Sequence, residues 1–290
     1  MNSFTLPGTS SRSASRLRAV LFAGLATTWA SGCAEQDVSM TMEFALPVNN
    51  FTCTPPQTIT ATTPILTRGT VDLSMARSYV MYPVVFNNMP DLRTAKGFTQ
   101  PTAARTNTSN IILKRAEVRY LPQERLSVTL PSKVELPLSG SVATSAANTV
   151  GSTTVGLEVF NDELLSAIRN SDEFLGVGAQ GEAVPLRNTV EMVVGVKVFG
   201  TTVGGQDQES NEFLFPIDIC NGCLVTVPNT AVDPAAPTPN CLRFDPFSFD
   251  NSSIACPNLV GQDLAVDCRV CKSQPATPLS AQLCEPSTGF

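Results

Sequence analysis

The distribution of cysteine is the feature that most constrains how this chain can fold. Nine cysteines occur in 290 residues, and seven of them lie between residues 220 and 290. From Leu224 to the end, the chain also holds nine prolines and few stretches of alternating apolar residues. Such a region cannot bury enough apolar surface to order itself, whereas covalent cross-links can order it. We therefore predict a Cys/Pro-rich, loop-dominated extension over residues 220–290, stapled by disulfides.

Eight of the nine cysteines are expected to form these disulfides, which leaves only the first cysteine apart. The expected set is Cys53, Cys220, Cys223, Cys241, Cys256, Cys268, Cys271 and Cys284. Because eight cysteines allow about a hundred pairings, the sequence does not give the connectivity. We expect only that Cys53 pairs with Cys220 or Cys223, which would join the first strand of the preceding domain to the end of its last strand.

Two C-x-x-C motifs, CNGC at 220–223 and CRVC at 268–271, leave two alternatives open. Four thiolates could bind zinc, but the 44 residues between the motifs far exceed the spacing of about 15–20 in a zinc ribbon. A C-x-x-C motif can also exchange disulfides where a thiol pKa is lowered, usually where a helix begins. CNGC instead follows a predicted strand. We predict disulfides, with no bound metal and no cofactor.

The first 32 residues have the features of a secretory signal. Arg12, Arg16 and Arg18 precede the apolar run Ala19–Ala30, and no acidic residue occurs in this segment. The run of 12 residues is too short for a membrane-spanning helix, which needs about 20. We therefore predict a signal peptide over residues 1–32, no transmembrane helix, and export to an oxidising compartment in which disulfides form.

The end of this leader, Ala30-Ser31-Gly32-Cys33, resembles the lipobox of bacterial lipoproteins. In that family the cysteine becomes the first mature residue and carries lipid, so the resemblance implies lipidation of Cys33 and a membrane anchor. Position −3 is Ala30 instead of the commoner Leu, and an ordinary signal cleaved after Ala34 is the alternative. Because Ala34 is not Asp, the resemblance implies the outer membrane, on its periplasmic or surface face. Residues 33–45 would form a tether near the lipid.

Residues 46–219 have the pattern of a β domain. Ala116–Tyr120 alternates apolar and polar residues, as a half-buried strand does. Ser152–Phe160 and Val190–Phe199 are rich in β-branched residues, and Glu212–Cys220 reads as the last strand. Short strands separated by turns predict a mainly β fold, an antiparallel, immunoglobulin-like β-sandwich. A closed barrel remains the alternative.

One short helix is predicted in this domain, over Asn161–Asn170. Asn161 can cap its N-terminus, and Leu164, Leu165 and Ile168 form one apolar face. A strand over Ser78–Asn87 contains Pro83, which cannot donate a hydrogen bond and therefore needs an edge or an irregularity there.

Composition excludes several classes of function. The chain contains no histidine, which removes Ser-His-Asp catalysis, Cys-His catalysis and every histidine-containing metal site. The full chain has a net charge of 19 − 25 = −6, and loss of the three leader arginines would make it 16 − 25 = −9. An acidic chain without a basic cluster has no electrostatic surface for nucleic acid. We therefore predict no nucleic-acid partner.

Three short motifs resemble functional sites. Gly176, Gly178 and Gly181 spell G-x-G-x-x-G, but a helix is predicted before them instead of a strand, so we interpret them as a loop. Four carboxylates that could serve a glycoside hydrolase are close in sequence; they are Asp162, Glu163, Asp172 and Glu173. The tripeptide GQD occurs at 205–207 and 261–263, and we interpret both copies as turns.

These observations favour a non-enzymatic lipoprotein of the bacterial cell envelope. In its overall organisation the chain is similar to Cys-rich lipoproteins of Gram-negative bacteria, a class without an assigned activity. We expect a structural or binding module that presents loops to a protein or glycan partner. A hydrolase of envelope polymers that uses paired carboxylates is the first alternative, and a Cys-based metal-binding or thiol-redox protein is the second. No catalytic residue is assigned.

Overall fold

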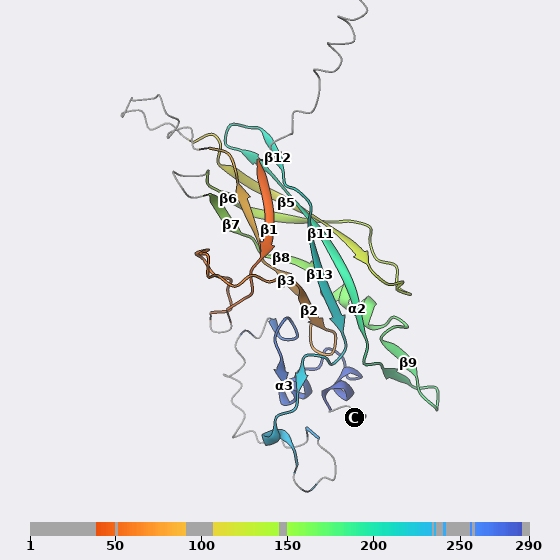
Figure 1. The fold of residues 1–290 in the computed structure, drawn as a ribbon. Coiled ribbons are helices and arrows are strands. Elements are labelled where there is room, and N and C mark those ends of the chain that lie inside the picture. Colours follow the sequence, from red (N-terminus) through yellow and green to blue (C-terminus); the bar gives the residue numbers. More distant parts are fainter. Residues whose placement is uncertain are drawn as a thin grey trace, which may run out of the picture. The chain divides into compact units, whose positions relative to one another are not determined.

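A computed structural model describes residues 39–49, 52–90, 107–144, 150–233, 235, 240–241, 256 and 259–285 (Figure 1). The predicted leader and Cys33 lie outside the described residues, so the structure does not bear on the signal peptide or on lipidation. All described residues belong to one structural unit, Val38–Phe290.

The larger of the two main β layers is a sheet of six strands. In order across the sheet these are β2 (Gly69–Asp72), β13 (Phe213–Cys220), β11 (Thr189–Thr202), β5 (Ile111–Pro122) and β6 (Val134–Val142), with β12 (Asp207–Glu209) paired to the end of β11. Neighbouring strands are antiparallel except β2 and β13, which are parallel. Along β11 buried and more exposed residues alternate, because successive side chains of a strand point to opposite faces.

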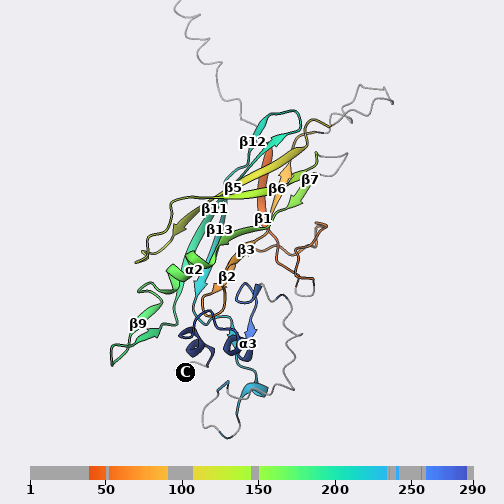
Figure 2. The ribbon, with the colours of Figure 1, turned by 180° about the vertical axis from the view of Figure 1, so that it is seen from behind.

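The second layer is built from three chain segments, two of which form two strands in succession. β1 (Met40–Ala45), β4 (Pro83–Asn87) and β7 (Gly151–Thr154) form a three-stranded antiparallel sheet. β3 (Tyr79–Met81) and β8 (Leu157–Phe160) pair beside it, and each adjoins β4 or β7 in sequence. Figure 1 and Figure 2 both show β1, β6, β7 and β12 toward one end of this unit and α3 toward the other.

The two layers share one hydrophobic core. Buried residues of the larger sheet, such as Val118, Val196 and Phe215, belong to the same cluster as Tyr79 and Leu157 of the second layer. The Tyr120 hydroxyl of β5 donates a buried hydrogen bond of 2.6 Å to the carbonyl of Val159 in β8. The predicted mainly β class is therefore confirmed. The layering agrees with a sandwich, although the parallel pairing of β2 with β13 departs from the antiparallel arrangement expected.

The predicted helix is present as α2 (Asp162–Arg169). The side chain of Asn161 accepts a hydrogen bond of 2.9 Å from the Leu164 backbone N–H, as an N-cap residue does. Leu165 and Ile168 are buried in the core. A second α-helix, α3 (Cys268–Ser273), lies in the extension, where only loops were expected. Asp267 caps it by accepting a 2.9 Å hydrogen bond from the Arg269 N–H.

One predicted boundary needs correction. The tether predicted over residues 33–45 includes Met40–Ala45, which the structure places in strand β1 with Met40 and Met42 buried. Short alternating runs of six residues are easily read as linker when no partner strand is visible in the sequence. Pro83 opens β4 opposite Ala45, where the β1–β4 register shifts, so the missing donor coincides with an irregularity as expected.

Cross-strand ion pairs cover the outer face of the larger sheet. Arg68 contacts Glu191 at 3.2 Å and Asp218 at 2.6 Å, and Lys133 contacts Glu117 at 2.9 Å. Arg119 also pairs with Glu212, and the Arg115 guanidinium lies 3.8 Å from the Phe199 ring centroid. Because the side chains of these pairs are partly exposed, this face of the sheet is in contact with solvent. Such exposed pairs each contribute little net stability.

The remaining elements lie outside the two layers. A hairpin follows α2, formed by β9 (Leu175–Val177) and β10 (Ala183–Pro185). In the extension, β14 (Val225–Thr226) pairs in parallel with β15 (Val266–Asp267), and short 3-10 turns occur at Asn229–Ala231 and Ser280–Cys284. Figure 1 shows α3 beyond the ends of β2 and β13. No helix among the described residues is long and apolar enough to cross a bilayer.

Candidate functional site

Four disulfides join the eight cysteines that were expected to pair. The pairs are Cys53–Cys256, Cys220–Cys223, Cys241–Cys268 and Cys271–Cys284. The prediction that all eight form disulfides agrees with the structure, but the prediction that Cys53 pairs with Cys220 or Cys223 is wrong. Cys220 and Cys223 lie three residues apart and bond to each other, which leaves Cys53 to reach Cys256. Disulfides of this number are typical of proteins outside the reducing cytosol.

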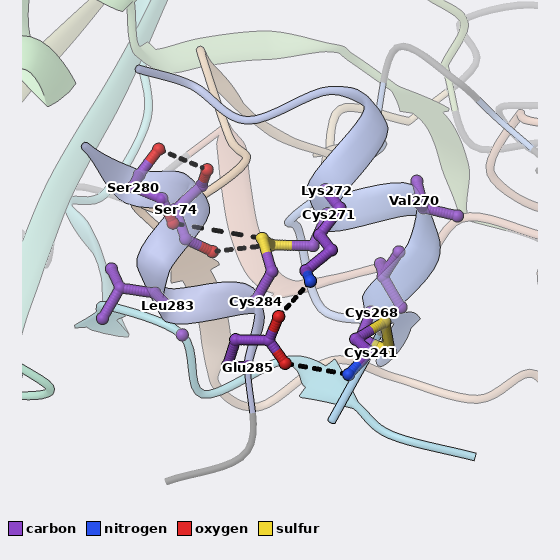
Figure 3. Close-up of a disulfide and its surroundings, with 12 residues drawn as sticks. Ser74, Cys241, Cys268, Val270, Cys271, Lys272, Ser280, Leu283, Cys284 and Glu285 are labelled. Carbon is purple, nitrogen blue, oxygen red and sulfur yellow. Dashed lines mark hydrogen bonds and ion pairs between the residues drawn. A yellow bond between two sulfur atoms is a disulfide. The ribbon is translucent and has the colours of Figure 1, made fainter. Parts of the chain in front are cut away.

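Two of these disulfides build the small core of the extension (Figure 3). Cys271 of α3 and Cys284 are fully buried together with Met75, and Cys241 and Cys268 pack with Ala231. Around them, Glu285 pairs with Lys272 and accepts a 2.8 Å hydrogen bond from the Cys241 N–H. The extension is therefore cross-linked internally as well as to the β layers.

Asp72, at the end of β2, anchors the CNGC segment to the β layers. Its carboxylate is fully buried and accepts hydrogen bonds from the Gly222 N–H at 2.7 Å and the Leu224 N–H at 2.8 Å. The backbone N–H and hydroxyl of Ser74 donate at 2.9 and 2.7 Å. Gly222 has φ +82°, a conformation that favours glycine. Four donors thus hold one carboxylate where no solvent reaches it.

The same cluster contains the ligand atoms that a metal would need, although the cysteines are oxidised. The carboxylate of Asp72 and the sulfurs of Cys220 and Cys223 lie within 4.8 Å of one another. While the two cysteines are bonded to each other, they offer no thiolate to a metal ion. The cluster therefore acts as an anchor in this oxidised state.

The second GQD tripeptide, Gly261-Gln262-Asp263, connects the two β layers. Its backbone continues the larger sheet, because the Asp72 N–H donates to Gly261 O at 2.8 Å and the Asp263 N–H donates to Thr70 O at 2.9 Å. Its side chains reach the second layer, since Gln262 Oε1 accepts from the Val80 N–H at 2.9 Å. This part of the extension therefore pairs with the edge strand β2 and also contacts β3 of the second layer.

The Asp263 carboxyl is partly buried beside β2 and β3. It accepts a 2.7 Å hydrogen bond from the Thr70 N–H and contacts the Tyr79 hydroxyl at 3.1 and 3.2 Å. Burial raises the pKa of Asp263 to about 6, although these two hydrogen bonds act in the opposite direction. The pKa of Tyr79 is also raised well above its ordinary value, by burial first and then by the charge of Asp263. Tyr79 therefore remains a hydrogen-bond donor to this carboxyl group.

A pocket of about 100 Å³ lies beside the Asp263 side chain. It is lined by Leu46, Pro47, Val48, Leu66, Val80, Met81, Tyr82, Leu259, Gln262, Asp263 and Leu264. The walls are mostly aliphatic, and Gln262 and Asp263 are its amide and acidic residues. Concave apolar surface with a few convergent polar groups is typical of sites that bind small ligands or side chains.

The Cys53–Cys256 disulfide joins two chain segments that each contribute residues to the lining of this pocket. Cys53 lies five residues after Val48, and Cys256 lies three residues before Leu259. Both cysteines have positive φ, +56° and +72°, which non-glycine residues rarely adopt. Asp263 also has positive φ, +55°. Uncommon backbone conformations therefore concentrate around this pocket.

The residues singled out from the sequence do not converge on this pocket. Gly176, Gly178 and Gly181 lie in or at the turn of the β9–β10 hairpin, so the loop interpretation needs refinement to a hairpin. Asp162 and Glu163 occupy the first turn of α2.

The second pair of acidic residues, Asp172 and Glu173, lies after α2. The Glu173 carboxylate accepts two hydrogen bonds of 2.8 Å from Ser127. Burial is the largest single influence on the pKa of Glu173 and raises it, but hydrogen bonds, among them those from Ser127, outweigh it and lower the pKa overall. Glu173 therefore positions a loop as an ionised acceptor.

Sequence reasoning missed Gln262 and Asp263 as site residues, because the GQD tripeptide was interpreted only as a turn. That interpretation is consistent with the backbone, since Gly205 and Gly261 have φ of +88° and +83°. The available signal was a carboxylate between apolar residues in a Cys-rich segment. It could not be separated from a solvated turn without knowledge of the pairing with β2.

The fold and the pocket together define a disulfide-stapled, mainly β protein with a small apolar site where its extension meets the β layers. No protein-family model and no curated protein matches the chain. A solution structure of a protein assigned provisionally to the late embryogenesis abundant (LEA) proteins is similar over 75% of this chain and 90% of its own. The two share 10% identity with a TM-score of 0.27, a level of similarity that carries no argument about this chain.

Proposed function

We propose that this protein is a non-enzymatic binding module of the bacterial cell envelope, which takes an apolar group of a partner into the pocket beside Gln262 and Asp263. The observation that carries the proposal is the pocket itself, whose aliphatic walls come from both the β layers and the extension. An apolar cavity of about 150 Å³ can stay dry and bind benzene or xenon, so a site of about 100 Å³ is large enough for a small aliphatic group.

The location in this proposal rests on sequence and on the disulfides. Four disulfides favour an oxidising compartment. The leader and the resemblance of residues 30–33 to a lipobox support export and lipidation of Cys33, with the outer membrane as the anchor. A lipid on Cys33 would hold the binding module close to the membrane, where envelope proteins and glycans are available as partners.

Xenon binding followed by NMR tests the pocket. Met81 lines it, and its methyl group is a reporter that can be labelled with ¹³C. We expect xenon to shift the Met81 methyl resonance in a saturable way. The matched control is Leu264→Trp, which places a larger side chain at a wall position that is 38% exposed and should suppress the shift. Saturable shifts at core methionines alone, with none at Met81, would contradict the proposal.

Mass spectrometry tests the anchor. The wild-type protein, extracted from membranes of a bacterial host, should begin at Cys33 and carry additional acyl mass, whereas Cys33→Ser should not. Non-reducing and reducing spectra should differ by the eight hydrogens that four disulfides lack. A wild-type mass that retains residues 1–32, or that begins at another residue without lipid, would remove the lipoprotein assignment.

A further inference from the structure

The pocket offers a hydrogen-bond donor and an acceptor side by side. Gln262 Oε1 must face the Val80 backbone N–H, because that group can only donate. The orientation of the carboxamide is therefore fixed, and its NH₂ group lies on the other side. Among the described residues this NH₂ group has no hydrogen-bond partner, although the residue is only 5% exposed and lines the pocket. It is a donor available to a ligand.

Asp263 supplies the acceptor. A carboxylate offers about four acceptor positions. Among the described residues, the Thr70 N–H and the single hydroxyl hydrogen of Tyr79 occupy two of them. Two positions therefore remain for other donors. Because Gln262 and Asp263 are adjacent in sequence and both line the pocket, a ligand group that both accepts and donates can satisfy them together.

We infer that the pocket binds one aliphatic side chain of an extended peptide segment of a partner protein, with a peptide C=O accepting from Gln262 and a peptide N–H donating to Asp263. This inference rests on the proposed function and names its ligand class. A peptide group carries one acceptor and one donor, and an aliphatic side chain matches the walls formed by leucine and valine residues.

Two other envelope ligands fit these observations less well. A long acyl chain has no donor for Asp263, and its volume is several times that of the pocket. An N-acetyl sugar does carry an amide, but its methyl group is smaller than the aliphatic space, and the walls contain a single aromatic side chain, Tyr82, on which a sugar ring could stack. The sugar is retained as an arm of the test.

N-acetyl-leucine methylamide is the probe that tests the inference, with the Met81 methyl resonance as the readout. We expect it to bind the wild-type protein, and to bind more tightly than the capped glycine that lacks the side chain. Gln262→Glu keeps the acceptor for the Val80 N–H but replaces the NH₂ donor with an oxygen. This variant should weaken binding of the capped leucine about tenfold and leave xenon binding unchanged.

The outcomes separate this inference from the proposed function. Three outcomes would overturn the peptide inference and leave the pocket standing. They are xenon binding without capped-leucine binding, equal binding of capped leucine by the wild type and by Gln262→Glu, and tighter binding of N-acetylglucosamine than of capped leucine. Failure of both xenon and capped leucine at Met81 would overturn both. Amide-proton spectra of the variant confirm that it is folded, so that a loss of binding reports on the donor.

Discussion

The Asp263 carboxyl should make the stability of this protein fall as the pH rises. Its pKa in the folded protein is about 6, against an ordinary value of 3.8. Because the folded pKa is raised, the native state holds this proton more tightly than the unfolded state does. The contribution to stability is fully present below pH 3.8 and is lost as the pH rises through 6. The shift of about two pH units corresponds to about 3 kcal/mol of unfolding free energy.

Asp263→Asn removes the titration and keeps the geometry. Asn retains an oxygen for the Thr70 N–H and, like Asp, tolerates the positive φ of this position. The variant should therefore gain stability relative to the wild type as the pH rises, by about 3 kcal/mol between about pH 3.5 and about pH 7.5. Urea denaturation with the disulfides intact measures the difference at each pH, and subtraction of the two proteins cancels the other titrating groups.

Asp267→Asn is a control of opposite sign. Burial raises the pKa of Asp267, but hydrogen bonds and the charge of Arg269 outweigh it and lower the pKa overall. The wild-type protein should therefore lose stability relative to this variant as the pH falls. A stability difference between wild type and Asp263→Asn that does not change with pH, alongside the expected behaviour of Asp267→Asn, would show that Asp263 is not buried as described.

Three further predictions concern stability. Replacing Cys53 and Cys256 together by Ser opens a loop of 203 residues, and chain entropy gives a loss of unfolding free energy of about 5 kcal/mol. Replacing Cys220 and Cys223 together by Ser should cost only about 2 kcal/mol, because that loop is short. Urea titration of both double variants compares the two losses. The first variant should also weaken xenon binding at Met81, whereas the second should not. Asp72→Ala leaves four hydrogen-bond donors without their acceptor and should lower the free energy of unfolding by more than about 3 kcal/mol in the same assay. Asn161→Ala removes a helix cap and should cost about 1 kcal/mol, so a cost as large as that of Asp72→Ala would contradict the ranking.

Local signals in the sequence predicted what local physics determines. Alternation identified β5, and a run of β-branched residues identified β11. A capping residue followed by spaced leucines identified α2. The proline-rich composition also identified a region that needs cross-links. These features depend on neighbours within a few residues, so they can be read without knowledge of the fold.

The features that failed all depend on pairing over long distances in the chain. β1 was interpreted as a tether because its partner, β4, lies some forty residues away, and the parallel pairing of β2 with β13 spans about half of the chain. The partner of Cys53 was wrong for the same reason, since nothing near Cys53 or Cys256 in sequence records that Gly261–Asp263 joins the edge of β2.

The pocket follows from how the extension compensates for its lack of a core. A segment of this kind becomes ordered by adding backbone hydrogen bonds to an existing sheet edge and by cross-links to the domain that provides that edge. Gly261–Asp263 does the first at β2, and Cys53–Cys256 does the second. The extension and the β layers, once connected in these two ways, need not fill the space between them, because neither connection depends on apolar packing there. The contacts that order the extension therefore leave an apolar space beside a carboxylate with free acceptor positions and an amide donor that has no partner among the described residues, an arrangement that suits the proposed binding site.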